Sequence, residues 1–309
     1  VRAGNELLRK EDVDAMISSS SPVTSHLIAK ELKTRHRIPW VADLRDLWTQ
    51  NHFYPYGPLR KLIERRLELR TLSMADAIVT VSQVLAEKLK MLHRRDVYNI
   101  PNGFDPDEMS DGNVNLTSKF TITYTGYIYT GKQDPSKLLA ALKELISCGT
   151  INPNDVEVRF YGQESRLLLQ QIEQYGLSDI VKQYGTIPRE ISFEKQRESQ
   201  LLLLLNWEDA WEKGVPTKKI FEYLAAQRPI LATGGFGNDV VEALLDETSS
   251  GTYRSTVEDI KNTLREFYLE YKFKGKVTYN GKVEKINKYS YREMARKFAE
   301  ILDNLIERN

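Results

Sequence analysis

The sequence predicts an α/β protein made of two Rossmann-like lobes, each built on a doubly wound parallel sheet. Three observations support this. Short apolar runs alternate with segments of helical spacing almost throughout the 309 residues. The apolar runs are nearly continuous, which is typical of strands buried on both faces of a parallel sheet. A chain of this length also exceeds what one hydrophobic core usually supports, so two domains are expected.

We expect the first lobe to span residues 1–112 and to be incomplete at its start. Residues 1–12 have the pattern of the end of a helix that enters a strand. A stretch dense in turn-forming residues, from Pro101 to Asn115, marks the boundary to the second lobe. The pattern predicts strands at 14–18, 39–43, 77–81 and 97–100, and helices at 26–37, 59–73 and 83–92.

We expect the second lobe to span residues 113–289 and a final segment to span 290–309. Met294, Phe298 and Ile301 recur with a helical period, so a long helix at 290–306 has one apolar face. The pattern of the second lobe predicts strands at 120–125, 156–161, 181–184, 201–206, 230–233 and 251–254, and helices at 135–147, 165–175, 192–199, 217–226, 238–246 and 257–271.

The charge balance and the cysteine count exclude several classes of protein. The chain carries 44 basic and 43 acidic residues, whereas a nucleic-acid-binding protein normally has a basic excess. The single cysteine, Cys148, cannot form an intrachain disulfide, and with only four histidines there is no basis for a Cys/His metal cluster. We therefore expect no nucleic-acid partner, no metal or other cofactor, and a reducing, cytoplasmic location. No run of about 18 apolar residues is present, so no membrane span is expected.

The loop after residues 120–125 has features of a phosphate site. Ligands of open parallel sheets bind outside the carboxyl ends of the strands, so two facing lobes would form a cleft lined by such loops. Gly126 and Gly131 let the backbone approach a ligand, and Lys132 stands just before a helix. A lysine there can neutralise a phosphate beside helix N-terminal amides, although a solvated loop lysine is the alternative. The dinucleotide motif Gly-x-Gly-x-x-Gly is missing, which argues against an oxidoreductase.

A second candidate segment begins at Gly214. Thr217 is a plausible N-cap, and Lys218 and Lys219 fall in the first helical turn. Cations at that end oppose the helix dipole, which favours an anion bound nearby. Glu222 lies one turn beyond Lys218 on the same face, so the alternative is a surface ion pair between these two side chains.

Several motifs occur together in an order and spacing that cover nearly the whole chain. The most specific is Lys219-Ile-Phe-Glu-Tyr-Leu-Ala-Ala-Gln-Arg-Pro-Ile-Leu-Ala232. Together, the motifs resemble glycosyltransferase family 4 and its relatives with the GT-B fold, whose first lobe is longer than this one. The supporting motifs are Asp43-Leu-Arg-Asp-Leu-Trp48, Ala75-Asp-Ala-Ile-Val-Thr-Val-Ser82, Asn99-Ile-Pro-Asn-Gly-Phe-Asp105, Tyr124-Thr-Gly126, Phe160-Tyr-Gly162 and Tyr184-Gly-Thr-Ile-Pro188.

The resemblance implies that the second lobe holds a nucleoside-diphosphate sugar. Glu222 matches the glutamate that binds the ribose hydroxyls, and Lys132 matches the lysine that holds the diphosphate. The final helix, in segment 290–309, would cross back to the first lobe. The remaining donor-binding candidates are Gly126, Tyr127 and Gly162 in strand-end loops, Gly185, Thr186 and Ile187 near the base, and Thr217 and Lys218 facing the phosphates.

Two positions depart from the family pattern. The family often has a glutamate eight positions before the ribose-binding one, and here that position is Gly214, with Glu212 close but out of register. The family's phosphate-binding arginine, one residue after the loop glycine, is Tyr127 here. Both departures are expected of a less active or divergent member.

The reaction implied by the resemblance is a metal-independent hexosyl transfer that retains the anomeric configuration. Lys132 and Lys218, with Glu222, form the predicted catalytic set, because the departing diphosphate needs cations and oriented N–H groups. We find no carboxylate pair suited to a double-displacement glycosidase scheme. The product would belong to a polysaccharide or another cell-surface glycan.

The acceptor, a saccharide or a lipid-linked saccharide, is expected on the first lobe. Residues Ser18 to Ser21 would follow a strand and offer hydroxyls or cap the next helix. The basic, aromatic stretch 52–70 would face anionic lipid at the inner face of the membrane, or be a solvated helix face. The acceptor-side candidates are Ser20, Asp43, Arg45, His52 and Asn102, with a buried Arg–Asp pair as the alternative role for Asp43 and Arg45.

Two other functions fit the same architecture. A nucleotide-sugar 2-epimerase would need acid and base groups near the sugar, and the sequence identifies none. A non-catalytic nucleotide-sugar-binding subunit would be consistent with Gly214 and Tyr127.

Overall fold

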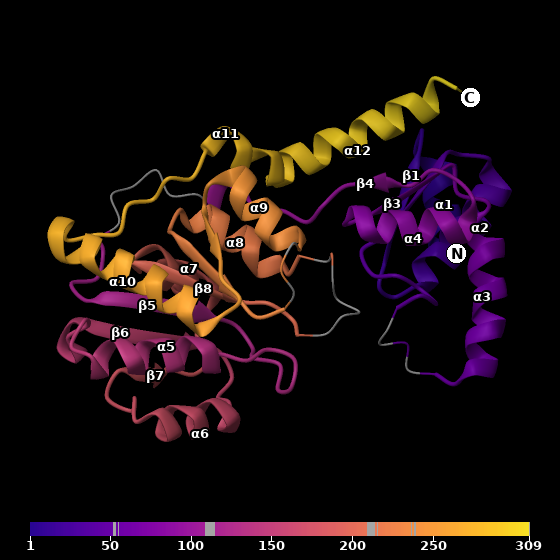
Figure 1. Cartoon of the computed structure of the whole chain (residues 1–309). Coiled ribbons are helices and arrows are strands. Elements are labelled where there is room, and N and C mark those ends of the chain that lie inside the picture. The colour runs from indigo at the N-terminus through magenta and orange to yellow at the C-terminus, as the bar shows by residue number, and fades with distance from the viewer. Residues whose placement is uncertain are drawn as a thin grey trace. The chain divides into compact units, whose positions relative to one another are not determined.

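The computed structural model describes residues 1–51, 54, 56–108, 115–208, 214, 216–235, 237 and 239–308. The chain divides into two compact units (Figure 1). The first unit consists of Val1–Asn102 with Tyr291–Asn309, and the second consists of Gly103–Ser290. The boundary expected after residue 112 falls outside the described residues. Phe104 already belongs to the second unit, because its ring is buried in that unit's core.

The first unit contains a parallel four-stranded sheet in the order β1-β2-β3-β4. Its strands are β1 (Met16–Ser20), β2 (Trp40–Leu44), β3 (Ala77–Thr80) and β4 (Tyr98–Asn99). Its helices are α1 (Arg2–Lys10), α2 (Thr24–His36), α3 (Pro58–Leu72), α4 (Gln83–His93) and, from the other end of the chain, α12 (Tyr291–Ile306).

Helix α12 packs on the sheet of the first unit through its apolar face. Ile301 lies in a buried cluster with Val41 and Val79, and Met294 and Phe298 pack against the same cluster. The helical period read from the sequence therefore corresponds to a buried face.

The second unit contains a parallel six-stranded sheet in the order β10-β9-β8-β5-β6-β7. Its strands are β5 (Phe120–Thr125), β6 (Val156–Tyr161), β7 (Val181–Gln183), β8 (Leu201–Leu205), β9 (Ile230–Thr233) and β10 (Gly251–Tyr253). Its helices are α5 (Ser136–Ser147), α6 (Arg166–Tyr175), α7 (Arg189–Arg197), α8 (Lys218–Ala226), α9 (Val240–Thr248), α10 (Val257–Lys274) and α11 (Val283–Ile286).

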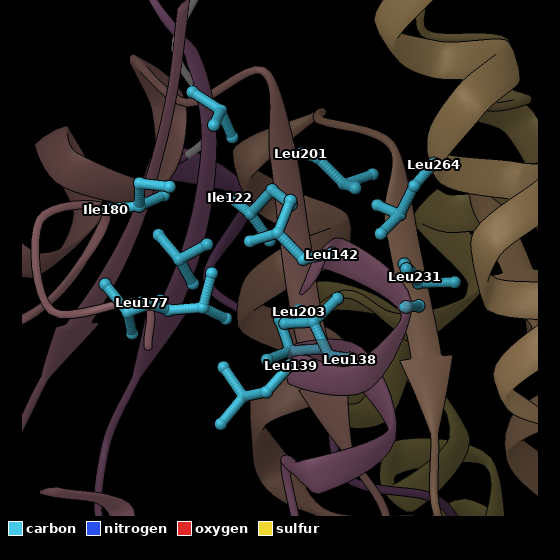
Figure 2. Close-up of a cluster of buried hydrophobic side chains, with 14 of the residues drawn as sticks. Ile122, Leu138, Leu139, Leu142, Leu177, Ile180, Leu201, Leu203, Leu231 and Leu264 are labelled. Atoms are coloured by element: carbon cyan, nitrogen blue, oxygen red, sulfur yellow. The ribbon is translucent and has the colours of Figure 1, made fainter. Parts of the chain in front are cut away.

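Helices cover both faces of this second sheet. The apolar run Leu201–Leu205 is fully buried, and its side chains alternate between two core clusters. Leu201 and Leu203 lie with α5 and α10 side chains such as Leu138 and Leu264, as Figure 2 shows. Leu202 and Leu204 instead pack with α8 and α9. This two-sided burial is why the run is continuously apolar.

Strand β5 is the point at which the strand order of the second sheet reverses. It pairs with β6 on one side and with β8 on the other. In open parallel sheets such a reversal opens a crevice at the carboxyl ends of the strands, which is where ligands bind.

Most elements begin and end close to their expected positions, and β5, β6 and β9 agree in every residue. Two differences affect the candidate sites. Helix α7 begins at Arg189, directly after Pro188, instead of at residue 192. Strand β1 extends to Ser20, so Ser18 and Ser20 lie inside the strand and not after it. Among the described residues, no helix combines the length and the apolar character needed to cross a bilayer.

Candidate functional site

The second unit contains a cavity of about 420 Å³ at the carboxyl ends of its strands, beside the reversal at β5. It is bounded by the ends of β5 and β6, the loop after β7, and the first turns of α7 and α8. The lining residues are Thr125, Gly126, Tyr161, Gly162, Thr186, Ile187, Arg189, Ser192, Phe193, Lys218, Lys219 and Glu222.

Three glycines join the neighbouring strand-end loops. The N–H of Gly126 donates to the carbonyl of Tyr161 at 2.7 Å, and the N–H of Gly162 donates to that of Gly185 at 2.9 Å. A Cβ on Gly162, whose φ is +147°, would lie 2.3 Å from the carbonyl oxygen of Gly126. Only glycine permits this approach, so the backbone at the cavity has a fixed shape.

Helix α8 presents an uncapped N-terminus at the cavity. Thr217 holds the N-cap position as expected, but its hydroxyl makes no capping hydrogen bond and is buried without a partner in the part of the chain that the structure describes. The first turn contains no acidic residue and contains both Lys218 and Lys219. The partial positive charge of the helix end and two cations therefore lie together, which favours an anion.

Tyr223 fixes α8 against the end of β5. Its hydroxyl accepts a hydrogen bond from the N–H of Thr125 at 3.1 Å, and its side chain is fully buried. Burial raises the pKa of Tyr223 well above its usual value, so the phenol stays neutral and its proton stays in place. Because residues three and four apart share a helix face, Lys219 lies on the same side as Tyr223.

Lys219 extends into the cavity beneath the loop glycine. Its Nζ lies 3.8 Å from the centroid of the Tyr124 ring, and a Cβ on Gly126 would lie 2.9 Å from that Nζ. Burial lowers the pKa of Lys219 to about 7, and the Glu222 carboxylate opposes this shift only in part. The site thus contains an amine that can gain a proton near neutral pH.

Glu222 forms its ion pair with Arg189 of α7. Arg189 Nη1 lies 3.2 Å from Glu222 Oε1. The alternative of an ion pair between Lys218 and Glu222 is therefore wrong for this structure. The pair forms because α7 begins at Arg189, which brings the guanidinium to the cavity.

The cavity brings together six of the donor-binding residues expected from the sequence, namely Gly126, Gly162, Thr186, Ile187, Lys218 and Glu222. Two more are adjacent: Gly185 through its hydrogen bond to Gly162, and Thr217 at the start of α8. The N–H of Gly214 donates to the Asp239 carboxylate at 2.9 Å, while Glu212 lies outside the described residues.

Lys132 and Tyr127 are not among the described residues that line the cavity. Lys132 Nζ lies 5.0 Å from the centroid of the Trp207 ring. Tyr127 packs edge-on against Tyr129, which in turn packs against Trp207. Tyr127 therefore belongs to an aromatic cluster with Tyr129 and Trp207, and Lys132 contacts the Trp207 ring of this cluster.

Six lining residues were not among the site residues expected from the sequence, namely Thr125, Tyr161, Arg189, Ser192, Phe193 and Lys219. Arg189 was placed before its helix, Lys219 was treated as one of two equivalent lysines, and Tyr161 was considered only as part of a strand. The sequence contains one signal for Lys219. This lysine precedes Glu222 by three residues and Tyr223 by four, so all three side chains are expected on one face of the helix.

The acceptor-side candidates lie in the first unit. Asp43 Oδ2 accepts hydrogen bonds from Ser19 and from Arg45, both at 2.9 Å, so the alternative of a buried Arg–Asp pair is what the structure contains. Arg45 also donates to the carbonyl of Ile100 at 3.1 Å. Ser20 is buried, and its hydroxyl has no hydrogen-bond partner among the described residues.

The expectation that Ser18 to Ser21 cap the next helix is wrong. The N-cap of α2 is Val23, without a side-chain hydrogen bond. The Ser18 hydroxyl instead lies 2.7 Å from His26 Nδ1 and accepts a hydrogen bond from Trp40 Nε1 at 2.8 Å. Asn102 is half-buried at the end of the first unit, and His52 lies outside the described residues.

The comparisons with known proteins agree with this architecture. Residues 1–108 match the model of Glycosyltransferase Family 4, which confirms the resemblance over that part of the chain. No curated protein matches the sequence. A Rickettsia africae ESF-5 glycosyltransferase superposes with a TM-score of 0.71 and 16% identity, over 100% of this chain and 81% of that one.

Two further solved structures have the same fold. Anabaena HepE in complex with UDP-glucose gives a TM-score of 0.66 with 14% identity, over 93% of this chain and 78% of that one. Sucrose-phosphate synthase from Thermosynechococcus elongatus gives 0.64 with 13% identity, over 100% of this chain and 77% of that one. The chain therefore has the GT-B fold, with two Rossmann-like units.

Proposed function

We propose that the chain is a retaining glycosyltransferase that moves a hexose from a nucleoside-diphosphate sugar to a saccharide or lipid-linked saccharide. The main support is the cavity, where an uncapped helix N-terminus, Lys219 and Glu222 meet beside the reversal of strand order. The GT-B fold and the family match of residues 1–108 agree with this proposal. The product would be a polysaccharide or another cell-surface glycan.

The proposed chemistry depends on stabilising the leaving group. As the bond between the anomeric carbon and the diphosphate oxygen breaks, negative charge develops on the diphosphate and positive charge on the sugar. The N–H groups at the start of α8 and the Lys218 side chain, which line the cavity, would meet this negative charge without a metal. The acceptor hydroxyl then bonds to the anomeric carbon from the same face, and its proton passes to the departing diphosphate oxygen.

Donor binding is proposed to divide between two parts of the site. Glu222 would accept hydrogen bonds from the ribose hydroxyls, and the backbone of Thr186 and Ile187, which also line the cavity, would meet the base. Lys132 would reach the diphosphate by moving from the Trp207 ring, which a long, flexible side chain can do at modest cost.

The acceptor would be presented at a membrane surface by helix α3. Leu59, Leu62 and Ile63 are 72%, 53% and 59% exposed on this helix. The same helix carries five cations, and such a mixture of exposed apolar and basic groups suits anionic lipid. The cations are Arg60, Lys61, Arg65, Arg66 and Arg70.

Calorimetry with UDP, GDP and ADP sugars tests donor binding, followed by an assay for sugar transfer. We expect one of these sugars to bind, and Glu222→Ala and Lys132→Ala each to weaken binding by about 1–3 kcal/mol, as for the loss of charge-assisted hydrogen bonds. Unchanged binding in both variants would remove the site assignment. Conversion of the donor without an acceptor would indicate an epimerase, and binding without turnover over many acceptors would indicate a non-catalytic subunit.

A further inference from the structure

The distribution of charge around the cavity leaves two lysines, Lys218 and Lys219, without an ion pair among the residues that the structure describes. The cavity is lined by three basic side chains, Arg189, Lys218 and Lys219, and by one carboxylate, Glu222. Arg189 forms the ion pair with Glu222. No hydrogen bond or ion pair of Lys219 Nζ is present in the part of the chain that the structure describes, and this atom lies 3.8 Å from the centroid of the Tyr124 ring.

The position of Lys219 is fixed by the fold. The hydrogen bond from the Thr125 N–H to the Tyr223 hydroxyl holds α8 against β5. This contact directs the Lys219 side chain under Gly126, where the absence of a Cβ leaves room for the amine. The amine therefore lies where a ligand that touches the Gly126 backbone would also touch it.

We propose that Lys219 binds the diphosphate of the nucleotide sugar directly, and that it takes up a proton when the donor binds. This inference rests on the proposed function, because it needs a nucleoside-diphosphate sugar in the cavity. Lys219 is then a catalytic residue in its own right, since an ammonium group at this position also meets the charge that develops on the leaving diphosphate.

The protonation step follows from the surroundings of the amine. Burial lowers the pKa of Lys219 to about 7, so most Lys219 side chains are neutral near pH 8. A diphosphate adds negative charge beside the amine and raises that pKa, because an opposite charge favours the ammonium form. The proton comes from solvent, and the bound state gains one ion pair.

Other titratable groups around Lys219 do not replace it in this role. Glu222 and Lys218 lie on α8, Arg189 lies on α7, and Tyr124 and Tyr161 lie on β5 and β6. Burial raises the pKa of both tyrosines, so they stay neutral near pH 8. A donor diphosphate is already fully ionised at that pH, so proton uptake would report on the amine.

The test is calorimetry near pH 8 in HEPES and in Tris, which differ in ionisation enthalpy. The titrants are the UDP, GDP or ADP sugar that binds and the corresponding nucleoside without phosphates. We expect the wild type to take up close to one proton with the nucleotide sugar and none with the nucleoside. Lys219→Gln should bind the nucleotide sugar about tenfold or more weakly, without proton uptake, and bind the nucleoside as the wild type does.

Two further variants complete the test. Lys219→Arg keeps a permanent charge and should bind without proton uptake. Lys195→Gln, which removes a lysine of α7 that pairs with Glu198 and is not among the residues lining the cavity, should match the wild type. Thermal unfolding checks that each variant folds. If Lys219→Gln fails to fold, the comparison of the wild type in the two buffers still tests the inference.

The outcomes separate this inference from the proposed function. Binding by the wild type without proton exchange, or full affinity and proton uptake in Lys219→Gln, overturns the inference and leaves the proposed function intact. If none of the nucleotide sugars binds the folded wild type, both are overturned.

Discussion

Arg189 Nη1 and Glu222 Oε1 lie 3.2 Å apart at the cavity of the second unit. The carboxylate proposed to hold the ribose is therefore paired with an arginine in this structure. The Arg189 side chain is 54% exposed and that of Glu222 is 33% exposed, and exposed pairs of this kind contribute about 0–1 kcal/mol. A ribose hydroxyl can consequently donate to the Glu222 carboxylate beside the arginine, or in its place, at a small cost in free energy.

Replacing the two partners of this pair should have unequal effects on donor binding. Glu222→Ala removes the proposed ribose contact, whereas Arg189→Ala removes only a weak competitor and should change the binding free energy by less than about 1 kcal/mol. Calorimetric titration of both variants measures the difference. Glu190→Ala, which removes an exposed carboxylate from the first turn of α7, is the matched control. Equal losses from Arg189→Ala and Glu222→Ala would mean that Arg189 contacts the donor itself.

The close approach of Gly162 to Gly126 should make alanine at position 162 destabilising. The added Cβ would lie 2.3 Å from a backbone oxygen, so the loops must separate, at a cost of about 1–3 kcal/mol in the free energy of unfolding. Denaturant unfolding gives this value. Gly149→Ala also places alanine at positive φ, 77°, but has no atom within 4 Å of the new Cβ. If both variants lose the same stability, the close approach contributes nothing.

His26 should make the first unit less stable in mild acid. Burial lowers its pKa to about 4 from 6.5, with Glu68 opposing the shift in part. Between those pH values the unfolded chain binds a proton that the folded chain does not, so the free energy of unfolding falls as the pH drops through this window. The slope approaches about 1.4 kcal/mol per pH unit for one such group.

Urea unfolding between pH 4 and 6.5 tests this linkage with His26→Asn, whose amide can still reach the Ser18 hydroxyl. The variant should show a shallower dependence of stability on pH than the wild type. Parallel curves for the two proteins would exclude His26 as the source of the acid sensitivity.

The fold could be predicted because its signals are local. The continuous run Leu201–Leu205 identifies a strand covered on both sides, and the burial of all five side chains is the physical reason for that pattern. The buried face of α12 could also be predicted locally, from the helical period of its apolar residues. Turn chemistry was less informative: the serines of β1 resemble a loop in sequence but are held inside the strand by the contacts of Ser18 with His26 and Trp40.

The candidate site could be predicted only in part, because its details depend on tertiary contacts. The loop glycines and Glu222 follow from motif positions, and the cavity brings them together. The burial of Lys219 depends on the bond between Tyr223 and Thr125, residues 98 positions apart, which no local pattern reports. Similarly, the ion-pair partner of Glu222 is Arg189 and not Lys218, because α7 begins at Arg189 and not at residue 192.

Helix α3 should bind vesicles that contain anionic lipid. Its exposed Leu59, Leu62 and Ile63 can enter the interface while its cations meet phosphate groups. Sedimentation with phosphatidylcholine vesicles, with and without phosphatidylglycerol, measures this binding. A triple serine variant of these three residues should lose binding at least tenfold, since each buried apolar side chain contributes about 1.5–3 kcal/mol. Replacing the exposed Met91 of α4 with serine is the control, and equal sedimentation of all three proteins would remove α3 as the contact.

The central claim is that the cavity at the reversal of strand order holds the nucleoside diphosphate of a sugar donor. A crystal structure of the protein with the tightest-binding nucleotide sugar tests this most directly. The account predicts a ribose within hydrogen-bond distance of the Glu222 carboxylate and diphosphate oxygens within hydrogen-bond distance of Lys219 Nζ and of the first N–H groups of α8. A nucleotide bound elsewhere in the chain, with this cavity filled only by water, would contradict it.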